Sequence, residues 1–287
     1  MHKRPTNILI LALAALLAAC ESEPTGTATN GPAQQLPSGT IPASPPIAFH
    51  DLLNTGFNAN NAAGPIELIY LPDQEQPELV VFRVDAQSMQ PSLVGYPQVG
   101  ISPRSAYASQ KLSLLIGSGF VSQTHSLEPV GLLQIDGQTL SPVQVHGYTR
   151  IIGINESGFG VVHRNEFSRD LFYSALQAGP GIIERGQLDI SERDLKRPRY
   201  FRSFLGLCDN AWLAGISLTP VHLRTLGEQL MTLFEAGQEN CTEVVNLAGD
   251  RQAVLMATLP DGRIAYHGDI NAHKVSLIGF AQSAAVE

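Results

Sequence analysis

The chain has 287 residues, of which 44% are hydrophobic and 7% aromatic, and its formal net charge at neutral pH is −8. This length and composition predict a folded domain with a sizeable core. The negative charge argues against nucleic-acid binding, which needs a basic face to displace counterions from phosphates. An anionic ligand would have to be met by a local basic cluster.

The N-terminus has the pattern of a secretory signal. Positive residues 2–4 precede an apolar run, residues 8–19, that is too short to span a bilayer comfortably. Residues 17–20 (Leu-Ala-Ala-Cys) resemble a bacterial lipobox, which implies acylation of Cys20 after cleavage. Glu21 then implies delivery to the periplasmic face of the outer membrane. The alternative is ordinary signal cleavage with an incidental cysteine.

A polar segment follows the signal. Residues 21–46 contain almost no large apolar side chain, so this stretch cannot bury enough surface to offset the entropy of ordering and is expected to be a flexible tether. Residues 47–64 are ambiguous, because Phe49 and Leu52 could dock on the domain whereas the Asn-rich run after them is typical of a loop. The expected division is a signal peptide (1–20), a tether (21–60) and a folded domain (61–287).

The domain is predicted to contain many short strands. Residues 65–71 and 78–84 form the first pair, joined by an acidic loop that contains proline. Asp136 and Gly137 between two apolar runs predict a hairpin, and residues 155–158 predict a second one. The remaining expected strands are residues 112–116, 150–154, 160–163, 175–178, 181–183, 201–207, 211–218, 243–245, 253–259, 263–267 and 275–280.

Helix signals are fewer. A helix is predicted over residues 220–236, with Thr219 as its cap, Pro220 at its first position and Gly237 after its end. Residues 102–110 are also compatible with a helix. Many strands with one or two helices predict an α+β domain built on a large mixed or antiparallel sheet.

Five short motifs occur in a fixed order along these elements. They are residues 117–121 (Gly-Ser-Gly-Phe-Val), 129–133 (Pro-Val-Gly-Leu-Leu), 177–180 (Gln-Ala-Gly-Pro), 202–206 (Arg-Ser-Phe-Leu-Gly) and 246–249 (Asn-Leu-Ala-Gly). Their order and spacing resemble the phosphodiester glycosidase family over roughly Pro65 to Met256. The resemblance implies that family's fold, a phosphorylated glycan or sugar phosphodiester as the binding partner, and hydrolysis of its glycosidic link.

The sequence departs from the family pattern at the two turns where the active site is expected. Gly117 and Ser118 replace the family's Asn and Gly, and Ala248 replaces its Asp. A carboxylate suits acid, base or nucleophile chemistry at a glycosidic bond, so Asp250, two residues later, is the candidate to replace the missing group. The alternative is a catalytically inactive envelope protein that binds a glycan or phosphate.

The candidate site residues follow from these motifs. Arg202 is the candidate for holding the phosphate, because a guanidinium presents two parallel donors to two oxygens, and it is grouped with Asp250 as catalytic. It also follows a run of cations between residues 193 and 199 that is more typical of a solvated loop. The candidate substrate-binding residues are Ser118, Gly119, Gln177, Ser203, Asn246 and Gly249.

The remaining cysteines and the histidines give weaker signals. Cys208 and Cys241 can form a disulfide in an oxidising compartment, or remain as two buried thiols. The histidines are scattered without ligand spacing. We therefore predict neither a metal site nor a cofactor.

Overall fold

The computed structural model describes residues 45–54, 64–71, 79–97, 99–122, 127–236 and 240–283. The predicted signal, the lipidation site Cys20 and most of the expected tether lie outside these residues. All of the described residues belong to one compact unit, Pro37–Glu287.

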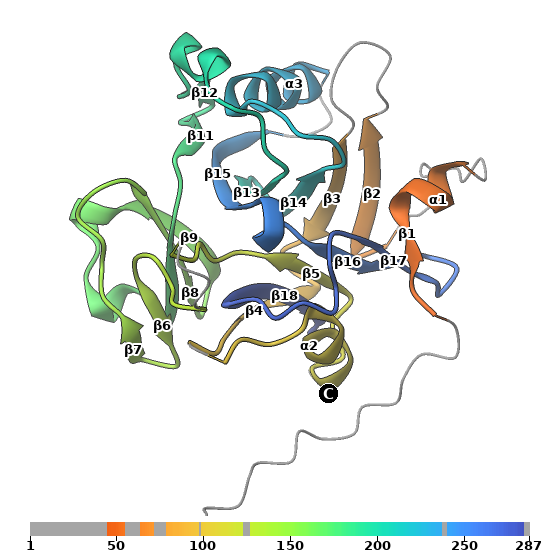
Figure 1. The fold of residues 1–287 in the computed structure, drawn as a ribbon, viewed down its shortest axis with the longest axis horizontal. Coiled ribbons are helices and arrows are strands. Elements are labelled where there is room, and N and C mark those ends of the chain that lie inside the picture. Colours follow the sequence, from red (N-terminus) through yellow and green to blue (C-terminus); the bar gives the residue numbers. More distant parts are fainter. Residues whose placement is uncertain are drawn as a thin grey trace, which may run out of the picture. The chain divides into compact units, whose positions relative to one another are not determined.

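The described strands form three sheets (Figure 1). The seven-stranded sheet has the order β12 (Gln187–Leu188), β11 (Gly181–Glu184), β15 (Cys241–Gly249), β13 (Arg202–Cys208), β14 (Ala211–Ser217), β3 (Leu79–Asp85) and β2 (Ile66–Leu71). The six-stranded sheet has the order β1 (Ile47–Ala48), β17 (Ile264–His267), β16 (Leu255–Thr258), β5 (Leu114–Gly117), β18 (Ser276–Gln282) and β4 (Met89–Gly95). The five-stranded sheet has the order β7 (Gln138–Ser141), β6 (Leu133–Ile135), β10 (Ser174–Ala178), β8 (Arg150–Asn155) and β9 (Gly158–His163).

The described helices are short. The α-helices are α1 (Phe49–Asn54), α2 (Pro103–Ser109) and α3 (Leu223–Glu235), and the 3-10 turns are η2 (Arg164–Glu166), η3 (Arg169–Leu171), η4 (Glu192–Lys196) and η5 (Asp250–Gln252). Within the part of the chain that the structure describes, no helix is long and apolar enough to cross a membrane.

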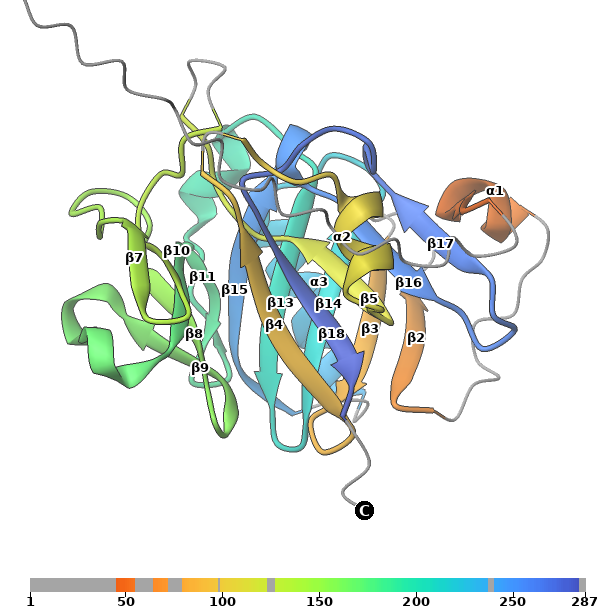
Figure 2. The ribbon, with the colours of Figure 1, turned by 90° about the horizontal axis from the view of Figure 1, so that it is seen from below.

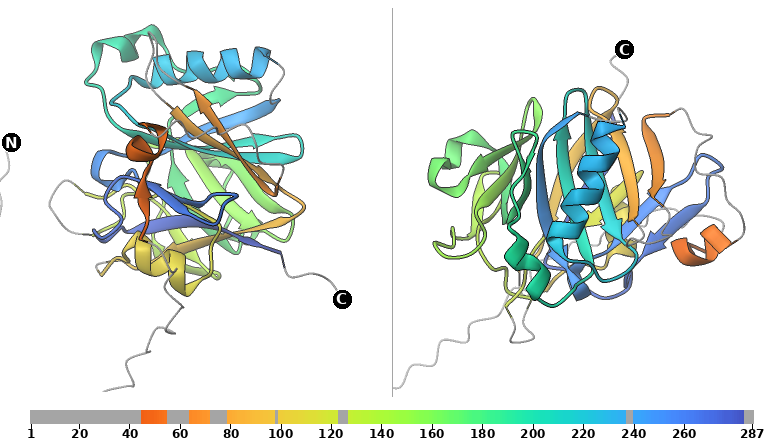
Figure 3. Two further views of the ribbon diagram at one scale, coloured as in Figure 1. Left: turned by 90° about the vertical axis from the view of Figure 1, so that its right-hand side faces the viewer. Right: turned by 90° about the horizontal axis from the view of Figure 1, so that it is seen from above.

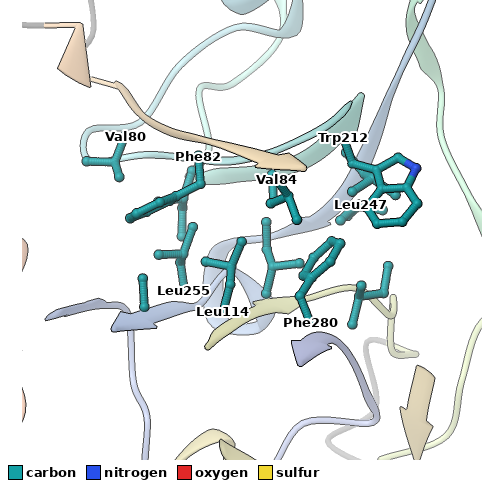
Figure 4. Packing of buried hydrophobic residues seen from close by; sticks show 14 of the residues in the cluster. Val80, Phe82, Val84, Leu114, Trp212, Leu247, Leu255 and Phe280 are labelled. Atoms are coloured by element: carbon teal, nitrogen blue, oxygen red, sulfur yellow. The ribbon is translucent and has the colours of Figure 1, made fainter. Parts of the chain in front are cut away.

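The main core lies between the seven-stranded and six-stranded sheets and also includes side chains of the five-stranded sheet, such as Ile152 and Leu176. Val80, Phe82 and Leu247 extend from the first sheet toward Leu114 and Phe280 of the second (Figure 4). These side chains alternate along their strands with residues of the opposite face, as the pleat of a strand requires. Burial of this shared apolar surface therefore fixes the two sheets against each other.

A helix covers the outer face of each of these two sheets. Leu226 and Leu230 of α3 pack on Phe204 and Val244 of the seven-stranded sheet, and Figure 3 shows the helix lying along that face. On the six-stranded sheet, Tyr107 of α2 belongs to a separate apolar cluster, and Figure 2 shows α2 beside β18 and β5. The result is a layered arrangement of helix, sheet, sheet and helix.

The predicted fold class is wrong. We expected an α+β domain on one large sheet, whereas the described regular structure is mainly strand with few helices, and the strands divide among three sheets. The strands were recognisable from local pattern, but their division among sheets depends on pairings between distant segments, such as β5 with β18. All strand pairs are antiparallel except that of β1 with β17.

Phe49 and Leu52 are fully buried in the main core, and Ile47 pairs with Ala265 of β17, so these residues of the ambiguous segment 47–64 dock on the domain. The start of the long helix differs from expectation. Its N-cap position is His222, whose side chain forms no cap hydrogen bond, and not Thr219. The chain stays extended until then because Val221 forms a backbone bridge with Tyr200.

The sequence did not predict the two-residue strands β1 and β12 or the longer strand β4. β4 contains Pro91, which lacks a backbone donor and argues against a central strand. β4 lies at the edge of the six-stranded sheet, where proline is tolerated.

The structure joins Cys208 of β13 to Cys241 of β15 in a disulfide. These residues are register partners on neighbouring strands. The disulfide therefore links the two ends of the segment that contains α3. It lies at the opposite end of β13 from Arg202.

Candidate functional site

Two turns meet at the ends of β5 and β15, which belong to different sheets. The turn after β5 holds Gly117, Ser118 and Gly119, and the turn after β15 is the 3-10 turn η5. The backbone of Gly117 donates to the carbonyl oxygen of Val254 at 2.8 Å. A Cβ at Gly117 would overlap the carbonyl oxygen of Gln252, so glycine permits this close approach.

The buried hydroxyl of Ser203 joins the two turns. It accepts from the backbone N–H of Ala248 at 3.1 Å and lies within donating distance of two carbonyl oxygens, that of Gly117 at 2.9 Å and that of Ala248 at 3.2 Å. Ser203 is fully buried. The residue therefore links the two sheets. Its hydroxyl is not accessible to a ligand from solvent.

Ser118 and Gly119 are held against the start of β18. The fully buried Ser118 hydroxyl lies 3.2 Å from the hydroxyl of Ser276, and either oxygen can be the donor. A Cβ at Gly119 would overlap the Ser276 side chain. These two predicted substrate-binding residues therefore fix the first turn in place.

Arg202 lies at the start of β13, beside the second turn. Its strand partner is Gly249, where an added Cβ would lie 3.5 Å from the Arg202 guanidinium. The guanidinium carbon is 4.8 Å from the centre of the Tyr200 ring, a cation–π distance. The Nε atom is buried and has no hydrogen-bond partner among the described residues.

The charge of Arg202 is balanced only in part. Burial lowers the pKa of its guanidinium, and the carboxylates of Asp194 and Asp250 act in the opposite direction. Arginine remains protonated under such conditions because its ordinary pKa is so high. The side chain as a whole is only partly buried, and a guanidinium with a donor that no described group uses is suited to binding an anion.

Asp250 occupies the exposed tip of the second turn. It has a φ of 47°, in the left-handed region that aspartate tolerates better than most residues. Ala248, the position at which the family resemblance implies a carboxylate, is fully buried. Of these two positions, only that of Asp250 presents a side chain to solvent.

Asn246 and Gln177 lie away from this turn. The buried Asn246 amide donates to the carbonyl oxygen of Gly179 at 3.1 Å, and its Oδ1 has no partner among the described residues. The Gln177 amide accepts from the backbone of Leu132 and Gln144, and donates to the carbonyl oxygens of Gln144 and Tyr148. These bonds use both donors and both lone pairs of Gln177, which leaves no capacity for a ligand.

A cavity of about 580 Å³ opens beside the second turn. Its lining residues are Phe201, Asp250, Arg251, Ala253, His267, Gly268, Asp269, Ala272 and Lys274. Within the described part of the chain, Asp250 is the only residue predicted for the site that lines this cavity. None of the other predicted residues lines this cavity.

Two titratable side chains of the cavity, His267 and Lys274, were not predicted for the site. His267 is partly buried against the Phe201 ring, and burial lowers its pKa. Lys274 is almost fully buried, burial lowers its pKa, and its ammonium donates to the carbonyl oxygen of Arg251. The available signal was a single lysine immediately before the apolar run of β18.

The described residues contain no group of three or more His, Cys, Asp or Glu side chains placed to hold a metal ion. The functional groups of the site are the guanidinium of Arg202, the exposed carboxylate of Asp250 and the cavity that Asp250 and His267 line.

The fold is similar to that of two solved structures. The catalytic domain of zebrafish N-acetylglucosamine-1-phosphodiester alpha-N-acetylglucosaminidase, auto-inhibited by its pro-peptide, matches with a TM-score of 0.57 and 13% identity over 78% of this chain and 86% of that one. A hypothetical protein from Synechocystis matches with a TM-score of 0.50 and 11% identity over 77% of this chain and 62% of that one. At these identities the similarity is one of fold.

The sequence matches no protein-family model and no curated protein. The fold resemblance expected from the motif order is thus supported by the structures alone.

Ser203→Ala should lower the free energy of unfolding by about 1–3 kcal/mol, because it leaves a buried N–H and a buried carbonyl without their partner. Urea denaturation measures the change. Ser168→Ala is the matched control, since Ser168 is exposed and its side chain forms no cap, and it should change the stability by less than about 0.5 kcal/mol. Equal losses in the two variants would show that Ser203 does not join the turns.

Proposed function

We propose that this protein is a hydrolase that cleaves a sugar phosphodiester or a related glycan linkage at the turn formed by Gly249 and Asp250. The observation that carries the proposal is the guanidinium of Arg202, which lies against Gly249 with a buried, unpartnered Nε. Similarity of fold to a phosphodiester alpha-N-acetylglucosaminidase supports the same class of reaction.

In this proposal the phosphate is held by Arg202 and the glycosidic bond lies beside Asp250. Water adds to the anomeric carbon, the bond from that carbon to the phosphate oxygen breaks, and the products are a free sugar and a phosphate monoester. The Asp250 carboxylate assists by accepting the proton of the water, and Arg202 stabilises the negative charge of the leaving phosphate. In this chemistry the exposed carboxylate of Asp250 replaces the carboxylate that the family resemblance implies at position 248, where this chain has alanine.

The second candidate is a binding protein that has lost the chemistry. The specific observation in its favour is Ala248, which is fully buried at the position where the resemblance implies a carboxylate. A protein of this kind would retain a glycosyl phosphate at Arg202 without consuming it.

Arg202→Ala should lower kcat/KM on glycosyl phosphodiesters by roughly 10²-fold or more, because a buried donor to the phosphate is lost. The kcat/KM of Arg202→Lys should lie between those of the unaltered protein and Arg202→Ala, since lysine keeps the charge without the paired donors. Product release from a panel of glycosyl phosphodiesters gives the rates. Arg193→Ala is the control, because Arg193 is an exposed cation of η4.

The outcomes separate the two candidates. Turnover that depends on Arg202 supports the hydrolase. Retention of a glycosyl phosphate that depends on Arg202, without turnover, supports the binding protein. A folded chain that neither binds nor cleaves any member of the panel contradicts both.

We also propose that the mature protein is anchored in the bacterial envelope by a lipid on Cys20, as the lipobox-like residues 17–20 suggest. Mass spectrometry of the N-terminal peptide from the bacterial membrane fraction should find Cys20 as an acylated first residue. Cys20→Ser should move the protein out of that fraction. An unmodified peptide that continues through Cys20, or membrane association that Cys20→Ser does not alter, would refute the anchor.

A further inference from the structure

The run of cations that precedes β13 forms an exposed basic surface. It consists of Arg193 and Lys196 of η4 and of Arg197 and Arg199 after it, and all four residues are exposed. The whole chain has 18 lysine and arginine residues and a net charge of −8. Four of these cations within one short segment therefore make a local positive surface on an acidic protein.

These four cations form no ion pair with a described residue. Arg224, on the neighbouring helix α3, is by contrast paired with Glu228 at 2.6 Å. The acid within the run, Asp194, is buried, and its carboxylate accepts the backbone N–H of Arg224 at 2.9 Å. Glu192, at the start of η4, is the exposed acid of the turn. Four exposed cations and one exposed acid leave the surface with a net positive charge.

Hydrogen bonds hold both ends of this run in place. At the first end, besides the bond to Asp194, the Arg224 guanidinium donates to the carbonyl oxygen of Ile190 at 2.8 Å. At the other end, the backbones of Tyr200 and Val221 exchange two hydrogen bonds, of 3.2 and 2.8 Å. The cations are thus carried on a fixed segment, which reduces the entropy lost when they bind a partner.

Apolar side chains lie among the cations. Leu195 is 46% exposed and Tyr200 is 37% exposed. A 3-10 helix has three residues per turn, so Arg193 and Lys196 share one side of η4, with Leu195 beside them and Asp194 toward α3. Cations combined with exposed apolar side chains are typical of segments that lie at the surface of an anionic membrane.

We propose that the basic surface docks on a membrane of anionic phospholipid, with its cations at the headgroup phosphates and Leu195 and Tyr200 at the apolar boundary. Charge complementarity supports this partner, because clusters of lysine and arginine are attracted to anionic leaflets. The two apolar side chains favour a membrane over a soluble polyanion, which offers no apolar phase. The docking requires neither turnover nor acylation of Cys20. Salt screens it, so a salt wash separates it from a lipid anchor.

The first test measures sedimentation of the full chain with vesicles, in the Cys20→Ser variant so that no lipid anchor contributes. Vesicles of equal parts phosphatidylglycerol and phosphatidylcholine should bind the protein at least about tenfold more tightly than vesicles of phosphatidylcholine alone, because only the former carry a negative surface potential. At about 1 M salt the Debye length falls to about 3 Å, and the difference should disappear.

A pair of triple variants tests whether the basic surface is responsible. Arg193→Gln, Lys196→Gln and Arg197→Gln in one chain should weaken binding to the anionic vesicles by at least about tenfold, since each cation near the membrane adds to the attraction. The matched control has the same net charge and carries glutamine at three exposed cations elsewhere, Arg104, Lys111 and Arg169. The control should bind as the unaltered protein does.

A second pair of variants tests the apolar contact. Leu195→Ser should weaken binding to the anionic vesicles without changing the charge of the protein. Leu171→Ser is its matched control, because Leu171 is a leucine of another 3-10 turn, η3, with a similar exposed fraction of 41%. Leu171→Ser should leave the binding unchanged.

Three results would overturn the proposal. They are equal binding to the two kinds of vesicle, equal losses in a variant and its matched control, and binding of soluble inorganic polyphosphate without binding of any vesicle. Glycosyl phosphodiesters are absent from these measurements, so their outcome does not depend on the proposed function.

Discussion

The geometry of the candidate site depends on a single buried hydroxyl between two sheets. Ser203 belongs to the seven-stranded sheet, and its oxygen contacts the backbone of Gly117 in the six-stranded sheet and of Ala248 in its own. The apolar core holds the sheets face to face, but apolar contacts are not directional. A directional bond at the edge of that core is what sets the position of one turn relative to the other.

The region around the site retains polar groups that a purely structural core would avoid. Arg202 Nε and Asn246 Oδ1 are buried without partners among the described residues, and the Lys274 side chain is almost fully buried. Each of these arrangements lowers stability. Such costs are typical of binding and catalytic sites, where polar groups are kept ready for a ligand. Arg202 and Lys274 lie beside the second turn, and their burial supports a site there.

Local sequence patterns identified most of the elements but not how they assemble. The Asp136–Gly137 hairpin has the expected strands, since Ile135 pairs with Gln138, and α2 begins after Ser102 as expected. Both depend on contacts between residues close in the chain. The three-sheet architecture depends on distant pairings, and the proline of β4 concealed an edge strand. The α+β expectation failed for that reason.

The sequence likewise predicted only part of the candidate site. The motif order pointed to two turns that the structure brings together, because Gly117 and Ala248 meet through Ser203. It did not reveal that Gln177 has all its hydrogen bonds within the protein, nor that His267 and Lys274 line the cavity. Lys274 reaches the carbonyl oxygen of a residue 23 positions earlier, a contact that no local pattern contains.

The central claim is that Arg202 holds the phosphate of the ligand beside Asp250. A crystal structure of the protein with a non-hydrolysable glycosyl phosphonate tests it most directly. The account predicts phosphonate oxygens within hydrogen-bond distance of the Arg202 guanidinium, next to Gly249. A phosphonate bound elsewhere, with Arg202 making no contact to it, would contradict the account.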